Sequence, residues 1–249
     1  MAVRLLLGVL CGFGLSAFSF AEAPRARRSA EFDTRNLEGW TVKVNRVLLD
    51  DQKDATERAL KLLRAQLAEI DRVVPAAAVA ELRNVPLWIS PEYPKTIPKA
   101  EYHPDAGWLR ENGRDPAMAK AVEFTNVRIF EAETRRMPNF ALHELAHAYH
   151  DRFLPRGFDN RDVKAAYEKA KASGKYDRVE RRDSEGRTKM DRAYALTNPQ
   201  EYFAETTEAF FTKNDFFPYT PDELKKHDPE MFTLLGKLWE GKAKPAAKK

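Results

Sequence analysis

The stretch NFALHELAHAYH at residues 139–150 decides how this chain is interpreted. Apolar residues recur in it and just after it, three or four positions apart, at Leu142, Ala146, Tyr149 and Phe153. Residues at this spacing share one face of an α-helix. The stretch therefore predicts a helix that begins near Asn139, runs through His150 and is anchored in the protein core by its apolar face.

His143 and His147 lie four residues apart on this predicted helix. They differ by about 40° in rotation and about 6 Å along the axis, so their side chains project together. Two neutral imidazoles in this arrangement can hold one Zn²⁺ at roughly 2.0–2.1 Å each. Glu144 lies about 100° around the helix, beside the metal, where a base can take a proton from water.

An alternative is an amphipathic helix that carries two histidines by chance. The chain has only five histidines, and three of them fall within residues 143–150. This clustering favours a site for one zinc ion per chain, provided that a third ligand exists. His150 is a poor candidate because it lies about 10 Å from His143 along the helix axis, and we expect it at a cleft rim or in solvent. Phe153 stands where the metzincin pattern would have a third histidine.

A second helix, predicted from Asn198 to Phe211, carries three acids on one face, at Glu201, Glu205 and Glu208. One carboxylate can complete the metal site, and another, a turn along the helix, can accept the second N–H of a ligand histidine and so fix its ring. We expect Glu201 to be the ligand and Glu205 to be the supporting residue. The reverse assignment of these two acids stays open.

Two simpler explanations of the acids are available. They could form a solvated face, and Glu201 could merely complete a capping box with Asn198. Apolar neighbours favour partial burial instead, and buried carboxylates require partners. These neighbours are Tyr202, Phe203, Ala204, Phe210 and Phe211.

The rest of the chain contains both strand and helix patterns, which predicts one α+β domain. We expect strands over residues 40–49, 85–90 and 122–130, and a hairpin that turns at residues 184–186. We expect helices over residues 55–74, 76–82 and 162–172, and two short ones that begin at Pro221 and Pro229.

Composition excludes several classes of protein. The chain has 249 residues, of which 32% are charged and 43% hydrophobic, so disordered, collagen-like and polytopic membrane proteins are excluded. The formal net charge of +4 is too small to indicate nucleic-acid binding.

The first residues have the pattern of a signal peptide. A short positive start is followed by an uncharged, mostly apolar run to Phe20 and by a small-x-small site that predicts cleavage after Ala21. Cleavage would remove Cys11, the only cysteine, and leave an exported protein without disulfides; a retained anchor is the alternative. We expect a flexible leader over residues 22–39, the domain over 40–241 and a basic tail over 242–249.

His143-Glu144-x-x-His147 followed by Glu201-x-x-x-Glu205 resembles the gluzincin metallopeptidases. The segment Glu201-Tyr202-Phe203-Ala204-Glu205, with Tyr194 seven residues upstream, is similar to the catalytic domain of anthrax lethal factor and its small exported bacterial relatives. This resemblance implies a zincin-like fold, in which the HExxH helix and a second ligand-bearing helix pack against a small mixed sheet. It also implies Zn²⁺ as cofactor, peptide or protein substrates, and Tyr194 as donor to the oxyanion.

The resemblance gives each element a role in peptide hydrolysis. Glu144 would act as general base, and residues 122–130 would be the edge strand that pairs with an extended peptide. An endopeptidase is favoured over an exopeptidase. His103, before Pro104, has no role beyond a turn. A zinc-binding module without turnover and a surface-interaction protein are the alternatives, and no feature of the sequence indicates an oligomeric state or a stable membrane insertion after signal cleavage.

Overall fold

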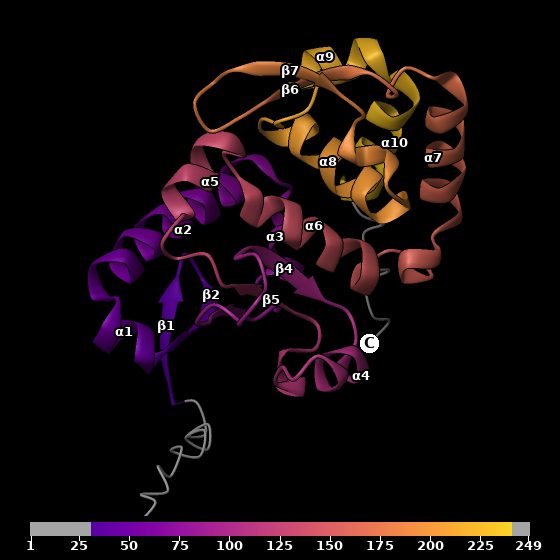
Figure 1. Ribbon diagram of the computed structural model, residues 1–249. Coiled ribbons are helices and arrows are strands. Elements are labelled where there is room, and N and C mark those ends of the chain that lie inside the picture. Colours follow the sequence, from indigo (N-terminus) through magenta and orange to yellow (C-terminus); the bar gives the residue numbers. More distant parts are fainter. Residues whose placement is uncertain (1–30, 241–249) are drawn as a thin grey trace, which may run out of the picture. The chain divides into compact units, whose positions relative to one another are not determined.

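The computed structural model describes residues 31–240 and confirms a mixed α+β domain (Figure 1). The predicted signal peptide, the first part of the leader and the basic tail lie outside the described residues. Five strands form a mixed sheet in the order β1-β2-β3-β5-β4, in which only the β1–β2 and β4–β5 pairs are antiparallel. The strands are β1 (Phe32–Leu37), β2 (Trp40–Asn45), β3 (Leu87–Ile89), β4 (Ala100–His103) and β5 (Ala121–Phe124).

Strand β1 corrects the flexible leader that we expected over residues 22–39. Phe32–Leu37 pairs with β2 through a two-residue turn at Glu38 and Gly39, both of which have positive φ. Turns of this kind fit the twist of a hairpin and are usually marked by Asn-Gly or Asp-Gly, so the Glu-Gly pair gave little signal. The next expected strand, over residues 40–49, ends at Asn45, whose side chain caps the short helix α1 (Arg46–Asp51).

Strand β5 corrects the strand expected over residues 122–130. It ends at Phe124, and it lies between β3 and β4 in the interior of the sheet. The free edge beside the candidate site therefore belongs to β4, a four-residue strand that the sequence did not reveal among the prolines around it.

Helix α6 is the central element of the fold. Leu142, Ala146 and Tyr149 are buried in the main core as predicted, and Phe153 is partly buried against it. It packs against α2, β4 and β5 on one side and against α8 on the other, so it joins the sheet to the C-terminal helices (Figure 1). The long helices are α2 (Lys53–Val73), α6 (Phe140–Phe153), α7 (Arg161–Ser173), α8 (Pro199–Phe211) and α10 (Pro229–Glu240).

Short elements complete the domain. A two-stranded hairpin, β6–β7, turns near Gly186 as predicted, and the helices α9 and α10 begin at the expected prolines. None of the helices within residues 31–240 combines the length and apolar character needed to cross a bilayer. The remaining elements are α3 (Ala76–Leu82), α4 (Ala106–Glu111), α5 (Phe130–Arg136), β6 (Val179–Arg182), β7 (Thr188–Asp191), α9 (Pro221–His227) and the 3₁₀ turns η1 (Pro116–Met118), η2 (Gly157–Asp159) and η3 (Tyr194–Leu196).

Gly39 gives a direct test of the β1–β2 turn. Its φ is +93°, and a Cβ atom there would lie 2.6 Å from Nε of Arg83, which donates to the carbonyl of Glu38 at 3.1 Å. We expect Gly39→Ala to lower the free energy of unfolding by about 2 kcal/mol, because backbone strain adds to the loss of that hydrogen bond. The measurement is urea unfolding.

Gly186 supplies the matched control for this variant. Its φ is +78°, but no heavy atom lies within 4 Å of the position that a Cβ atom would take there. Gly186→Ala should therefore show the backbone strain alone, a cost of about 1 kcal/mol. Equal losses in the two variants would contradict a steric role for Arg83.

Candidate metal centre

Helices α6 and α8 bring the predicted ligands together. The side chain of Asn139 caps α6 by accepting from the N–H of Leu142, and that of Asn198 caps α8 by accepting from the N–H of Glu201. The carboxylate of Glu201 lies against His143 and His147 of α6, which places it in the site rather than in a capping interaction alone.

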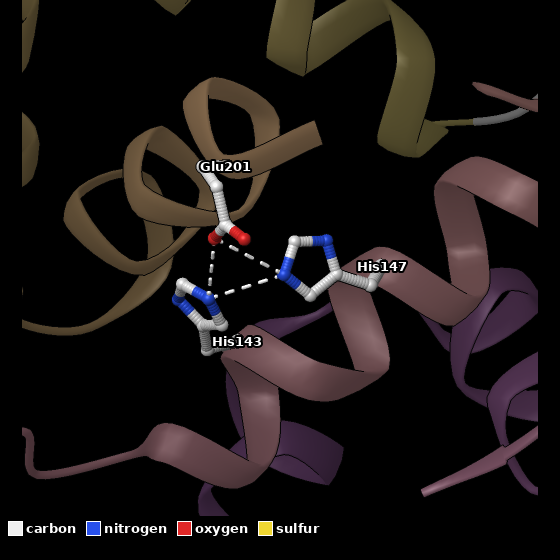
Figure 2. A group of neighbouring side chains, drawn as sticks. All are labelled: His143, His147 and Glu201. Atoms are coloured by element: carbon white, nitrogen blue, oxygen red, sulfur yellow. Dashed lines mark hydrogen bonds and ion pairs between the residues drawn. The ribbon is translucent and has the colours of Figure 1, made fainter. Parts of the chain in front are cut away.

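The three predicted ligands form a nearly regular triangle (Figure 2). Nε2 of His143 is 3.2 Å from Nε2 of His147, and Oε2 of Glu201 is 3.2 Å and 3.3 Å from these two nitrogens. Three ligands of a tetrahedral ion, each about 2.05 Å from it, are separated by about 3.3 Å. The donor set and its spacing therefore fit Zn²⁺.

The electrostatics of the site favour positive charge. Burial opposes a charge on His143, but the carboxylates of Glu208 and Glu201 raise its pKa well above the usual value. Burial likewise raises the pKa of Glu201, yet hydrogen bonds from His143 and His147 outweigh it and hold this pKa well below the usual range. The ring nitrogens and carboxylates of this site stabilise a bound proton, so they are also suited to bind a metal cation.

The supporting carboxylate is Glu208 in the structure, where we expected Glu205. Nδ1 of His143 is 2.6 Å from Oε1 of Glu208, whereas Oε1 of Glu205 is 3.7 Å away. Glu205 instead accepts a hydrogen bond from the side chain of Asn214 at 3.1 Å. The sequence predicts that all three acids share one face of the helix. The seven-residue separation of Glu201 and Glu208, about two turns, agrees with this prediction.

A charge network that lines the same cleft was not apparent from the sequence. Asp215 is fully buried, and its Oδ2 accepts from Arg136 at 2.7 Å and from Arg181 at 3.4 Å. Its negative charge and that of Glu208 contribute to the raised pKa of Glu205, after burial itself. Arg136, Arg181 and Asp215 come from three distant parts of the chain, so no local motif marks them.

The predicted base and oxyanion donor both line the cleft that contains the triangle. Oε2 of Glu144 accepts a hydrogen bond from the backbone N–H of Tyr102 in β4 at 2.8 Å. Tyr194, in η3, is 46% exposed, and burial together with the nearby Glu201 raises the pKa of its phenol. It therefore remains protonated at neutral pH and can donate a hydrogen bond.

The cleft has a volume of about 490 Å³. Its walls come from β4 on one side, from the start of α6 in the middle, and from α8 and β6 on the other. Apolar residues Met137 and Phe140 line it next to charged ones such as Arg136 and Glu133.

His150 contradicts the expectation of a rim or solvated position. It is fully buried, its ring packs against those of Phe158 and Phe203, and neither ring nitrogen has a hydrogen-bond partner among residues 31–240. Burial, and then the nearby His147, lower its pKa to about 4. The residues that cover it follow α6 or lie in α8, so helix periodicity within α6 alone could not reveal its burial.

His103 is likewise more than a turn residue. It is the last residue of β4 and is only 1% exposed, with Nε2 2.9 Å from Oε2 of Glu123 in the neighbouring strand. Arg114 contacts the same Glu123 oxygen at 3.3 Å and binds Glu101 at 2.6 Å. This network supports the outer strand of the sheet from the face opposite α6.

Comparison with known proteins agrees with this geometry. Residues 122–240, which run from β5 to the end of α10, match the family model described as glucose-regulated metallo-peptidase M90. That match supports a zinc metallopeptidase. No curated protein and no solved structure matches the chain, so the resemblance to the lethal factor domain stays a prediction.

The matched segment contains every candidate metal ligand and Glu144, but not β4. A metallopeptidase requires a metal, usually zinc, and peptide or protein substrates. The His and Glu triangle fits such an ion.

The role of Glu208 can be tested by zinc affinity. We expect Glu208→Gln to weaken zinc binding about 10–100-fold, because His143 loses the charged acceptor that orients its ring. Glu205→Gln should weaken binding less, and Glu201→Ala, which removes a ligand, should weaken it more. Affinity is measured by competition with a chromophoric chelator; a larger effect of Glu205→Gln would reverse the roles of the two acids.

The burial of His150 predicts acid sensitivity. Its pKa is about 4 in the folded protein and 6.5 as a free side chain, so the unfolded chain binds more protons between these values. Stability is therefore fully present above pH 6.5 and falls as the pH drops towards 4. Between pH 7 and pH 4.5, protonation of His150 in the unfolded chain should lower the free energy of unfolding by about 2.5 kcal/mol.

His150→Leu should remove this part of the acid sensitivity. The measurement is urea unfolding of metal-free wild type and variant at pH 7 and pH 4.5, so that metal release does not contribute. The variant should lose about 2.5 kcal/mol less than wild type between the two pH values. Equal losses would show that His150 is not buried in its neutral form.

Proposed function

We propose that this protein is an exported zinc endopeptidase that hydrolyses peptide bonds in polypeptides. The observation that carries the proposal is the triangle of His143, His147 and Glu201, with Glu144 lining the same cleft. The match to metallopeptidases over the helices that bear these residues supports it. Export rests on the signal-like pattern at residues 1–21 of the sequence.

His143, His147 and Glu201 would hold the ion, which supplies Lewis acidity towards the scissile carbonyl and the attacking water when it is bound. Glu144 takes one proton from that water as its oxygen bonds to the carbonyl carbon. The same carboxyl then returns the proton to the leaving amine as the C–N bond breaks. Hydrogen bonding from the N–H of Tyr102 keeps this carboxylate on the side of the cleft next to β4.

Tyr194 is the proposed donor to the oxyanion. It stands in η3, one short loop before α8, and its raised pKa keeps the proton on the phenol. A donor already directed at the developing charge lowers the barrier because it need not reorganise during the reaction.

The substrate would bind as an added strand along β4, through the edge groups that Glu144 leaves free, because Glu144 occupies the N–H of Tyr102. Ala100, Glu101 and Tyr102 of β4 line the cleft, and Glu101 and His103 are also held by their network with Arg114 and Glu123. Pairing of the polypeptide with this edge on both sides of the cleaved bond would favour an endopeptidase. Strand β4 therefore takes the substrate-pairing role that we expected for residues 122–130, because β5 already has a neighbouring strand on each side.

Glu144→Gln tests the proposal. It should abolish cleavage of a peptide library, with a loss of at least about 10³-fold in kcat, because the general base is removed. Zinc content should stay near one ion per chain, because Glu144 is not a ligand. Mass spectrometry of the library identifies the cleavage products.

The alternative function, a zinc-binding module without turnover, is separated by the same experiment. Zinc bound by wild type without any cleavage would favour that module. Equal cleavage by wild type and Glu144→Gln would contradict the proposed chemistry, and absence of bound zinc in the wild type would contradict both.

A further inference from the structure

Tyr102 connects the free edge of the sheet to the helix that carries the histidines, and it does so at two points. Its backbone N–H donates to Oε2 of Glu144 at 2.8 Å, and its phenol donates to Oδ2 of Asp151 at 2.7 Å. Glu144 and Asp151 lie seven residues apart on α6, so both face the same strand. His147 stands between them in the sequence.

The pairing of the sheet leaves this N–H available. Val122 donates its N–H to the carbonyl of Pro86, on the β3 side of β5. The backbone groups of the adjacent residues, Ala121 and Glu123, therefore point towards β4. On the β4 side the carbonyl groups of Lys99 and His103 accept from the N–H groups of Thr125 and Lys120, which directly follow and precede β5. Backbone groups of a strand alternate between its two sides, so those of Tyr102 point to the free edge. The N–H of Tyr102 is therefore the one that Glu144 uses.

The phenol end is equally well defined. Tyr102 is only 6% exposed, and its ring meets that of Phe158 edge-on, with centroids 6.5 Å apart. Asp151 also forms an ion pair with Lys120, which lies directly before β5. The carboxylate of Asp151 is 13% exposed, so it is a fixed acceptor shared by the sheet and the helix.

We propose that Tyr102 is a positioning residue that fixes the edge strand β4 against α6. A substrate paired with β4 is then held at the correct distance from the carboxylate of Glu144. The proposal rests on the proposed peptidase function. Tyr102 acts through Glu144 and through the strand, and its side chain does not touch the reacting atoms. Because a displacement of about 1 Å between substrate and catalytic group can cost about 10²-fold in rate, a clamp at this point affects turnover directly.

Kinetics of zinc-loaded variants test the role in turnover. Tyr102→Phe removes the phenol and should lower kcat about tenfold, with KM and zinc affinity within about twofold of wild type. Asp151→Ala should cause a similar loss, and the double variant should lose no more than either single one, because both remove the same hydrogen bond. Asp151→Asn keeps an acceptor for the phenol and should retain most of the activity.

Lys120→Met is the matched control. It removes the ion pair between Lys120 and Asp151, in which the side chain of Lys120 is 48% exposed. The hydrogen bond between Tyr102 and Asp151 stays in place. Ion pairs of this exposure contribute little, so kcat should remain within about twofold of wild type. A loss of kcat in this variant equal to that of Tyr102→Phe would overturn the specific role of the phenol.

Amide hydrogen exchange measures the clamp without turnover. In Tyr102→Phe the N–H of residue 102 should exchange at least about tenfold faster, because its bond to Glu144 is no longer held, while the amides of α6 keep their rates. Unchanged exchange at residue 102 would overturn the clamp, and faster exchange with wild-type kcat would overturn its role in positioning. If wild type cleaves no peptide, the peptidase proposal fails while the exchange result still decides whether the clamp exists.

Discussion

The contact between α6 and α8 is the constraint on which the rest of the structure depends. It directs two imidazoles and several carboxylates, most of them buried, at one another. Buried carboxylates of this number are unfavourable unless a cation, a proton or hydrogen-bond donors compensate them. His143 meets Glu201 through one ring nitrogen and Glu208 through the other, so its ring is held from both sides. The candidate metal site and the interface between the two helices are therefore one structural feature.

A large part of this arrangement could be predicted from the sequence. The four-residue spacing of His143 and His147 fixes their common direction on any helix, and the acids of α8 lie on one face for the same reason. The buried stripe of α2 followed equally from its spacing, since Leu63, Leu67 and Ile70 are all fully buried. Predictions of this type succeed because they depend on the geometry of a single element.

The errors concern relations between elements. Strand β1 and the edge position of β4 depend on which strands pair, and neither short strand has a pattern strong enough to show it. The assignment of the supporting acid failed because Glu205 and Glu208 share a face, and only the placement of α8 over α6 decides which one reaches Nδ1 of His143. His150 was misplaced because its cover, Phe158 and Phe203, comes from outside α6.

Two separate parts of the fold thus determine the geometry of one cleft. On one side, Glu201 and Glu208 of α8 contact the two ring nitrogens of His143. On the other, β4 holds Glu144 through a backbone hydrogen bond. The ligands belong to the contact between α6 and α8, whereas the base faces the sheet. Because His143, Glu144 and His147 all lie on α6, which packs against both parts, this helix has to remain rigid for the base and the candidate ligands to keep their relative positions.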